Sequence, residues 1–249
     1  MTPPLIIHPW PIIAFLVAIA FIAGLARGFS GFGAALIFIP LASAAVGPTL
    51  AAPILLVIDG FGAAPMLPSA WRYSDRRAVF VMSAGALVAI PVGTLALTRI
   101  DPVMLRWGIS TAILLLVGLL ASGWRYAGRP LPIVTVGVGL VSGFLSGSAQ
   151  IGGAPAVAYW LGSASSAQSV RANMVLFLAC STVYTVVAYG VSGLFGWGMV
   201  ALSLAAGPAY LAGTTLGTRM FGLASQETFR RICLALIALA AILGLPLFR

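Results

Sequence analysis

Two glycine-rich clusters interrupt the apolar runs of this chain, and they carry residue types suited to binding a small anion. The first reads GFSGFG over residues 28–33, and the second reads SGSAQIGG over residues 146–153. A helix that starts directly after such a cluster directs its free N–H groups and the positive end of its dipole toward the cluster. Glycine permits close approach to that backbone. We therefore predict a small-anion site at the two clusters, built from helix N-termini without any charged side chain.

The predicted substrate-binding residues come from the two clusters and from one Arg–Asn pair that opens a later apolar segment. The serine and glutamine side chains of the clusters can add hydrogen-bond donors, and the Arg–Asn pair could hold a sulfonate or a carboxylate. The alternative for the glycines is tight helix packing, and the alternative for the arginine is a charge that sets topology. The full set is Gly28, Ser30, Gly31, Gly33, Ser146, Ser148, Gln150, Gly152, Gly153, Arg171 and Asn173.

Asp59 is the only carboxylate that lies within an apolar segment long enough to cross a membrane. Ionisable residues at membrane depth are costly and usually functional. Because a bare carboxylate would repel an anion, we expect Asp59 to pair with Arg27, which lies beside the first cluster, or to bind a coupling proton. The alternative for Arg27 is that its side chain snorkels to the interface.

The composition places these residues in a membrane protein. Of the 249 residues, 61% are hydrophobic and only 7% are charged, whereas soluble domains carry about a quarter charged residues. The net charge of +9 would suggest nucleic acid in a soluble protein, but basic residues in short loops set the orientation of a membrane protein. We expect a lipid bilayer and a small anion as partners, with no nucleic acid, no cofactor and a possible homodimer.

The hydrophobic runs predict an all-α polytopic protein with a single membrane domain of two repeats. Segment 152–163 is too short to cross the bilayer, because a helix of that length rises only about 18 Å. Each glycine cluster is therefore expected at the tip of a re-entrant or broken-helix hairpin. Repeat 1 (1–124) has a hairpin over 10–46 and transmembrane helices over 49–69, 78–98 and 103–121, and repeat 2 (125–249) has a hairpin over 131–163 and helices over 168–190, 197–217 and 228–247.

The two halves of the sequence resemble each other, which favours an internal duplication. IPVGTLALTR at 90–99 and YLAGTTLGTR at 210–219 share a Gly, two Thr and an Arg at identical spacing, with an offset of 120. An offset of 119 lays Gly33 on Gly152. Chance matching of small residues between apolar helices is the alternative.

The arginines predict the topology. If both hairpins return to their starting side, nine arginines share one side and three face the other, and the positive-inside rule places the larger group in the cytoplasm. Each repeat then adds three crossings, an odd number, so the repeats are inverted and both termini lie outside. The nine are Arg72, Arg76, Arg77, Arg125, Arg129, Arg171, Arg219, Arg230 and Arg231, and the three are Arg99, Arg106 and Arg249.

The two tips, GFSGFGAALIFIP and GFLSGSAQIGGAPAVAYWL, resemble those of the sulfite exporter TauE/SafE family, also called the 4-toluene sulfonate uptake permease family. The resemblance covers nearly the whole chain, including the Gly-Thr helices at Gly93 and Gly213. It implies a multi-pass permease of a bacterial inner membrane that moves sulfite, sulfonates or sulfoacetate. Members often carry a fuller glycine triplet at each tip, whereas here Ala34 and Ala35 follow Gly33.

We therefore expect a secondary permease for small anions, above all sulfur-containing oxyanions or organosulfonates, that works as an exporter. A permease for small carboxylates and a non-transporting scaffold or assembly factor are the alternatives. The G-x-S-G pattern at residues 28–31 fits an intramembrane serine protease, but the chain has no lysine and only His8 as a general base, so we expect no enzyme. No cluster of His, Cys or carboxylates suits a metal either.

Overall fold

The computed structural model describes residues 9–30, 33–123, 131–161, 167–220 and 226–247. This part of the chain holds eleven α-helices and one 3-10 helix, with no strand. Seven of its helical segments are long and apolar enough to cross a membrane. The elements are α1 (Trp10–Ser30), α2 (Ala34–Val46), α3 (Pro48–Ala63), η1 (Ala64–Met66), α4 (Leu67–Tyr73), α5 (Arg76–Arg99), α6 (Pro102–Ala121), α7 (Pro132–Ala149), α8 (Gly153–Trp160), α9 (Ala167–Val191), α10 (Trp197–Met220) and α11 (Gln226–Gly244).

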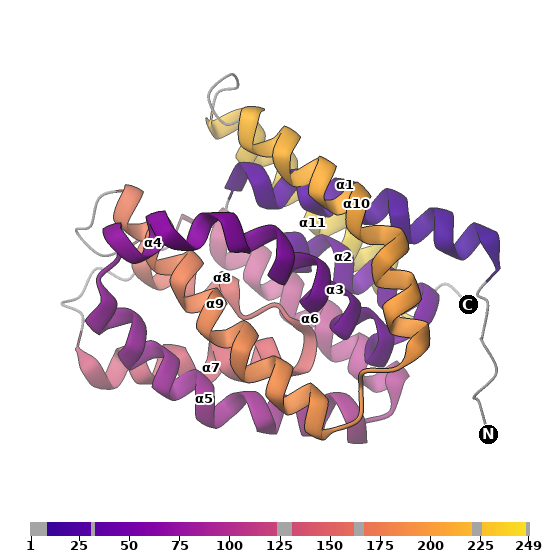
Figure 1. Ribbon diagram of the computed structural model, residues 1–249, viewed down its shortest axis with the longest axis horizontal. Helices are drawn as coiled ribbons and strands as arrows, with labels where there is room; N and C mark the ends of the chain where they lie inside the picture. The colour runs from indigo at the N-terminus through magenta and orange to yellow at the C-terminus, as the bar shows by residue number, and fades with distance from the viewer. Residues whose placement is uncertain (1–8, 31–32, 124–130, 162–166, 221–225, 248–249) are drawn as a thin grey trace.

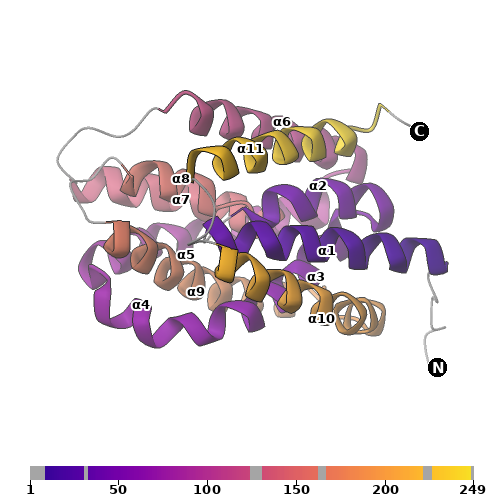
Figure 2. The ribbon, with the colours of Figure 1, turned by 90° about the horizontal axis from the view of Figure 1, so that it is seen from above.

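Two pairs of consecutive helices, α1 with α2 and α7 with α8, meet in the interior of the molecule. The outer ends of α1 and α2 lie at one end of the molecule, and those of α7 and α8 lie at the opposite end (Figures 1 and 2). α2 and α8 are short, at 13 and 8 residues, so α8 rises only about 12 Å. Neither short helix is long enough to cross the roughly 30 Å hydrocarbon core of a bilayer on its own.

Glycines bring two helix pairs into close contact, α1 with α10 and α5 with α7. A side chain on Gly24 or Gly28 would overlap carbonyl oxygens of α10, and one on Gly147 would overlap a carbonyl oxygen of α5. The contacts advance in the same direction along both members of each pair, so these helices run parallel. Small residues at such crossings allow the close backbone approach that associates helices in lipid.

Two of the four acidic residues act as helix caps. The Asp75 carboxylate accepts a hydrogen bond from the backbone N–H of Ala78 at 3.1 Å, at the start of α5. The Asp101 carboxylate accepts from the backbone N–H of Val103 at 2.9 Å, at the start of α6. Aspartate is among the preferred N-cap residues because it satisfies N–H groups that the helix leaves unpaired. Neither of these carboxylates lies in the interior, and among the described side chains Asp59 is the partly buried carboxylate to explain.

The outer surface is apolar, as a lipid-facing surface must be. Ile133, Phe61 and Leu204 are more than 70% exposed, and such side chains in water would be a liability. At the corner between α4 and α5 the surface changes to arginines stacked on aromatic rings, with the Arg76 guanidinium carbon 5.3 Å from the Trp71 ring centre. Aromatic and basic residues gather in this way at the membrane interface. The molecule is a multi-pass membrane protein.

Helices α6 and α11 lie side by side along one edge (Figure 2), linked by a hydrogen bond from Arg106 Nη2 to the Gly244 carbonyl at 3.0 Å. The first turn of α1 and the last turn of α11 lie at the same end of the molecule (Figure 2).

Candidate functional site

The inner ends of the α1–α2 pair and of the α7–α8 pair, which are called the two hairpins from here on, line one cavity. The cavity measures about 30 Å³, which is space for a few water molecules. Its walls come from the end of α1, the starts of α2 and α8, the turn before α8, and single residues of α3 and α9. The lining residues are Arg27, Gly33, Ala34, Ala35, Leu36, Asp59, Gln150, Ile151, Gly153, Ala154 and Leu178.

Two helix N-termini point into this cavity. Ala34, Ala35 and Leu36 form the first turn of α2, and Gly153 and Ala154 begin α8. Within the described chain, neither N-terminus receives a hydrogen bond from a side-chain cap. The first N–H groups of a helix have no partner within the helix, and the dipole leaves partial positive charge there. The cavity therefore offers backbone donors and positive potential from two directions.

The backbone is left-handed on both sides of the cavity. Gly33, at the start of α2, has a φ of 100°, and Gln150, at the end of α7, has a φ of 59°. Glycine adopts this region without steric cost, but a glutamine there is strained, and such strain gathers at functional sites. Gln150 is the only residue other than glycine with a positive φ in the described chain.

The Gln150 side chain is held by two hydrogen bonds that it donates itself. Its amide nitrogen donates to the Ser146 carbonyl at 3.1 Å and to the Tyr189 hydroxyl at 3.3 Å. The Tyr189 hydroxyl in turn donates to the Gly147 carbonyl at 2.9 Å. Tyr189 is fully buried. Both amide hydrogens of Gln150 are therefore engaged, so Gln150 stabilises the turn rather than offering a free donor to a ligand.

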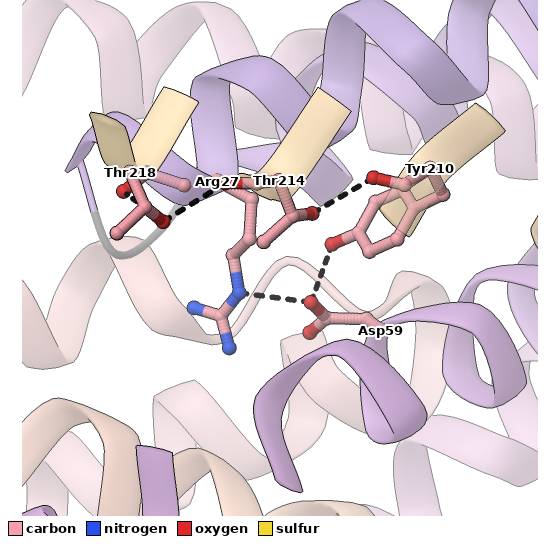
Figure 3. Close-up of polar contacts among 6 residues, drawn as sticks. Arg27, Asp59, Tyr210, Thr214 and Thr218 are labelled. Atoms are coloured by element: carbon pink, nitrogen blue, oxygen red, sulfur yellow. Dashed lines mark hydrogen bonds and ion pairs between the residues drawn. The ribbon is translucent and has the colours of Figure 1, made fainter. Parts of the chain in front are cut away.

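A partly buried ion pair borders the cavity (Figure 3). Arg27 Nε lies 2.8 Å from Asp59 Oδ1, and the Tyr210 hydroxyl donates to the same oxygen at 2.5 Å. These residues come from α1, α3 and α10, and Arg27 and Tyr210 both point toward the same oxygen of Asp59 (Figure 3). The Arg27 side chain is 5% exposed and that of Asp59 is 27% exposed. A buried charge needs such pairing because its desolvation cost is high.

The two threonines of the repeated motif hold the backbone of α10 near this pair. Thr214 donates to the Tyr210 carbonyl at 2.9 Å, and Thr218 donates to the Thr214 carbonyl at 2.8 Å (Figure 3). In α5, Thr94 donates to the Ile90 carbonyl at 3.0 Å and Thr98 to the Thr94 carbonyl at 3.0 Å. The motif therefore makes the same bonds in both helices.

The structure brings some of the predicted site residues to the cavity. Gly33, Gln150 and Gly153 line it, together with the predicted ion-pair residues Arg27 and Asp59. Ser30 and Gly31 lie outside the residues whose side chains the structure describes. The remaining predicted residues lie outside the lining, and these are Gly28, Ser146, Ser148, Gly152, Arg171 and Asn173.

Packing accounts for the place of four of those remaining residues. Gly28 faces the backbone of α10, and Ser148 faces Gly93 on α5. Gly152 packs against the backbone of Ser142 inside its own hairpin. The side-chain amide oxygen of Asn173, Oδ1, accepts a hydrogen bond from the Asp75 backbone N–H at 2.8 Å, which ties α9 to the corner between α4 and α5.

Tyr210, Tyr189 and Leu178 belong to the site but were not among the residues predicted from the sequence. A signal for Tyr210 exists, because it opens the repeated segment 210–219 at a position where the first copy has Ile90. When one repeat has a polar residue where the other has an apolar one, the polar residue has a role that the duplication does not explain. No comparable signal marks Tyr189 or Leu178.

Two adjacent glycines of the second tip, Gly152 and Gly153, are predicted to differ sharply in how well they tolerate an added side chain. A methyl group on Gly152 would overlap the Ser142 carbonyl oxygen and the Ser146 hydroxyl, whereas one on Gly153 would make ordinary contact with Leu178 at 3.6 Å. We expect Gly152→Ala to lower anion flux in proteoliposomes at least tenfold, because the turn below the cavity must shift. Gly153→Ala should stay within about threefold of the parent protein. Equal flux in the two variants would contradict this assignment of the turn.

One comparison with known proteins identifies a family. The family model described as "Sulfite exporter TauE/SafE" matches residues 16–243. Comparison with curated proteins and with solved structures gave no match. The matched range includes both hairpins, the cavity between them and the Arg27–Asp59–Tyr210 contacts.

Proposed function

We propose that this chain, which belongs to the sulfite exporter TauE/SafE family, is a secondary permease that binds small sulfur-containing oxyanions in the cavity between its two hairpin tips. The observation that carries the proposal is the convergence of two helix N-termini without side-chain caps and the Arg27 guanidinium on one cavity. Helix N-termini bind anions through backbone N–H groups, and guanidinium groups match the geometry of oxyanions.

The size of the cavity favours a compact substrate. About 30 Å³ accommodates an anion of few atoms such as sulfite, whereas a sulfonate with an aromatic ring would need the walls to separate. The first turn of α2 adds the methyl groups of Ala34 and Ala35 to the wall, which narrows the first tip. We propose sulfite and short organosulfonates as the substrate class.

Two inverted repeats are the proposed architecture, and the cavity lies at their interface as in other secondary transporters. Three pairs of lining residues support this, because their members are 119 positions apart: Ala34 and Gly153, Ala35 and Ala154, Asp59 and Leu178. The parallel packing of α1 on α10 and of α5 on α7 supports it as well, since inversion relates one pair to the other.

The proposed orientation places both termini outside the cytoplasm. The corner between α4 and α5 carries Arg72, Arg76 and Arg77, all exposed, and the positive-inside rule places such a corner in the cytoplasm. The start of α1 and the end of α11 lie at the opposite end (Figure 1). The membrane potential alone favours export, since a monovalent anion leaving the cell gains about 2.3 kcal/mol per 100 mV.

Flux of labelled sulfite in proteoliposomes tests the proposal. We expect saturable flux that sulfoacetate and isethionate inhibit and that lactate leaves within twofold. Binding should also raise the melting temperature of the detergent-solubilised protein, because a ligand of the folded state stabilises it. Inhibition by lactate but not by sulfonates would favour a carboxylate permease. The absence of both flux and stabilisation for every anion would favour a non-transporting membrane scaffold.

A further inference from the structure

The cavity is electrically balanced in the absence of substrate. Among the residues that line it, Arg27 and Asp59 are the only charged ones, and they form one ion pair. Other charged side chains of the described chain lie at helix ends, such as Asp75, Arg99, Asp101 and Arg219. An anion that enters the cavity therefore adds a net negative charge to a site that is only partly exposed to solvent, where charges interact more strongly than in bulk water.

Asp59 and a bound anion would share the same guanidinium. Asp59 Oδ1 accepts the bond from Arg27 Nε and the bond from the Tyr210 hydroxyl. Arg27 and the first turn of α2 line the same cavity as Asp59. An oxyanion held by that turn and by Arg27 thus lies next to the Asp59 carboxylate, and the two negative groups repel each other. Protonation of Asp59 removes the repulsion and leaves Arg27 to balance the substrate.

Resting on the permease function proposed above, we propose that anion binding is coupled to protonation of Asp59, so that one proton accompanies each monovalent anion. Coupling between two binding sites is reciprocal. The anion therefore favours the protonated carboxyl group, and low pH favours anion binding. The proton comes from water through the exposed part of Asp59. The Tyr210 hydroxyl keeps donating to Oδ1, so the proton occupies the other carboxylate oxygen.

Among the helices of the described chain that pack around Asp59, no second group is suited to this role. Helices α2 and α7, which pack near α3, carry no titratable side chain, and α5 and α6 carry arginines toward their ends. α10 contributes Tyr210 and, at its end, Arg219. α9 contributes Cys180, Tyr184 and Tyr189, with Arg171 in its first turns, and thiols and phenols are neutral near pH 7. Asp59 is the carboxylate among these groups.

Coupling changes what drives transport. A monovalent anion that moves with a proton carries no net charge, so the membrane potential exerts no force on the pair. The anion gradient and the pH gradient then set the direction together. An alkaline interior would favour uptake, in contrast to the export that charge alone favours.

The proton can be counted directly with a probe that does not titrate itself. Isethionate is a sulfonate, a strong acid, and stays ionised throughout the pH range of the titration. Calorimetric titration of the purified full-length protein with isethionate, in two buffers of different ionisation enthalpy at pH 7.5, gives the number of protons taken up. We expect close to one proton per anion, and an affinity that rises up to tenfold per unit of falling pH. Binding with no proton uptake and no dependence on pH would overturn the coupling and leave the proposed function intact.

Two variants assign the proton to Asp59. Asp59→Asn should bind isethionate with no proton uptake, and acceleration of its flux by a pH gradient should fall at least tenfold. Asp101→Asn, which changes a helix cap to another good cap, should keep the proton count of the parent protein. Persistent proton uptake in Asp59→Asn would overturn the assignment. Absence of both binding and flux in the parent protein would instead overturn the proposed function.

Discussion

Arg27→Gln is expected to lower anion flux at least 100-fold, the largest loss that we predict for a single side chain. Arg27 is the only cationic side chain that lines the cavity in the described chain. Its removal takes away the guanidinium that would balance the substrate and leaves Asp59 to repel it. A loss of 100-fold corresponds to about 2.7 kcal/mol, which is within the range for charge-assisted hydrogen bonds at a buried site. The measurement is initial flux of labelled sulfite in proteoliposomes.

The control is Arg99→Gln, because Arg99 is an exposed arginine at the end of α5. Its flux should stay within twofold of the parent protein. Removing Arg27 also leaves a partly buried carboxylate without its partner and lowers stability, so melting temperature is measured beside flux. The double variant Arg27→Gln/Asp59→Asn restores neutrality and should recover the melting temperature but not the flux. Recovery of flux in the double variant would show that Arg27 is needed only to hold Asp59.

The sequence predicted the membrane class and the family, because both depend on features spread over the whole chain. Long hydrophobic runs indicate the segments that cross a membrane. The observed helices lie along those runs, as α5 does over Arg76–Arg99. The predicted pairing of Asp59 with Arg27 is also present. It could be inferred because a carboxylate at membrane depth needs a partner, and Arg27 was the cation nearest to the first tip.

The roles of the individual glycines could not be assigned from the sequence, because a residue without a side chain can serve either of two purposes. Gly33 provides a left-handed backbone at the cavity, whereas Gly28 allows α1 to approach α10. Both lie in one six-residue cluster. On a helix, the face to which a residue points decides between the two purposes, and the neighbours on that face come from remote parts of the chain.

Polar residues near a predicted site raise the same difficulty. Asn173 follows the second hairpin closely in sequence, but its side chain bonds to the backbone of Asp75 in the other half of the chain. Tyr210 lies 151 residues from Asp59 and donates to it. Contacts between residues so far apart in the sequence depend on how the helices pack. The apolar pattern that predicts each helix contains no information about the polar partners of its residues.

Gly213→Val is expected to destabilise the protein by about 3 kcal/mol, because the crossing of α1 and α10 has no room for a side chain. A Cβ at Gly213 would overlap the Phe21 carbonyl oxygen. Backbone atoms cannot rotate away as a side chain can, so the two helices must separate, and overpacking of this kind costs about 1–3 kcal/mol or more. The free energy of unfolding in mixed micelles measures the effect.

Gly108→Val and Gly108→Ala are the controls. They show what replacing a helical glycine does to stability when the added side chain overlaps nothing. Gly108 lies within α6, is exposed, and has nothing within 4 Å of an added Cβ. Alanine there should stabilise the helix by roughly 0.5–1 kcal/mol, since glycine is a poor helix former, and valine should be close to neutral.

Gly93→Val, at the matching crossing of α5 and α7, should behave as Gly213→Val does, because a Cβ on Gly93 would overlap the Phe144 carbonyl oxygen. If Gly213→Val were no less stable than Gly108→Val, α1 and α10 would not pack as closely as the structure shows. Arg27 would then lack the fixed position next to Tyr210 and Asp59 on which anion binding depends.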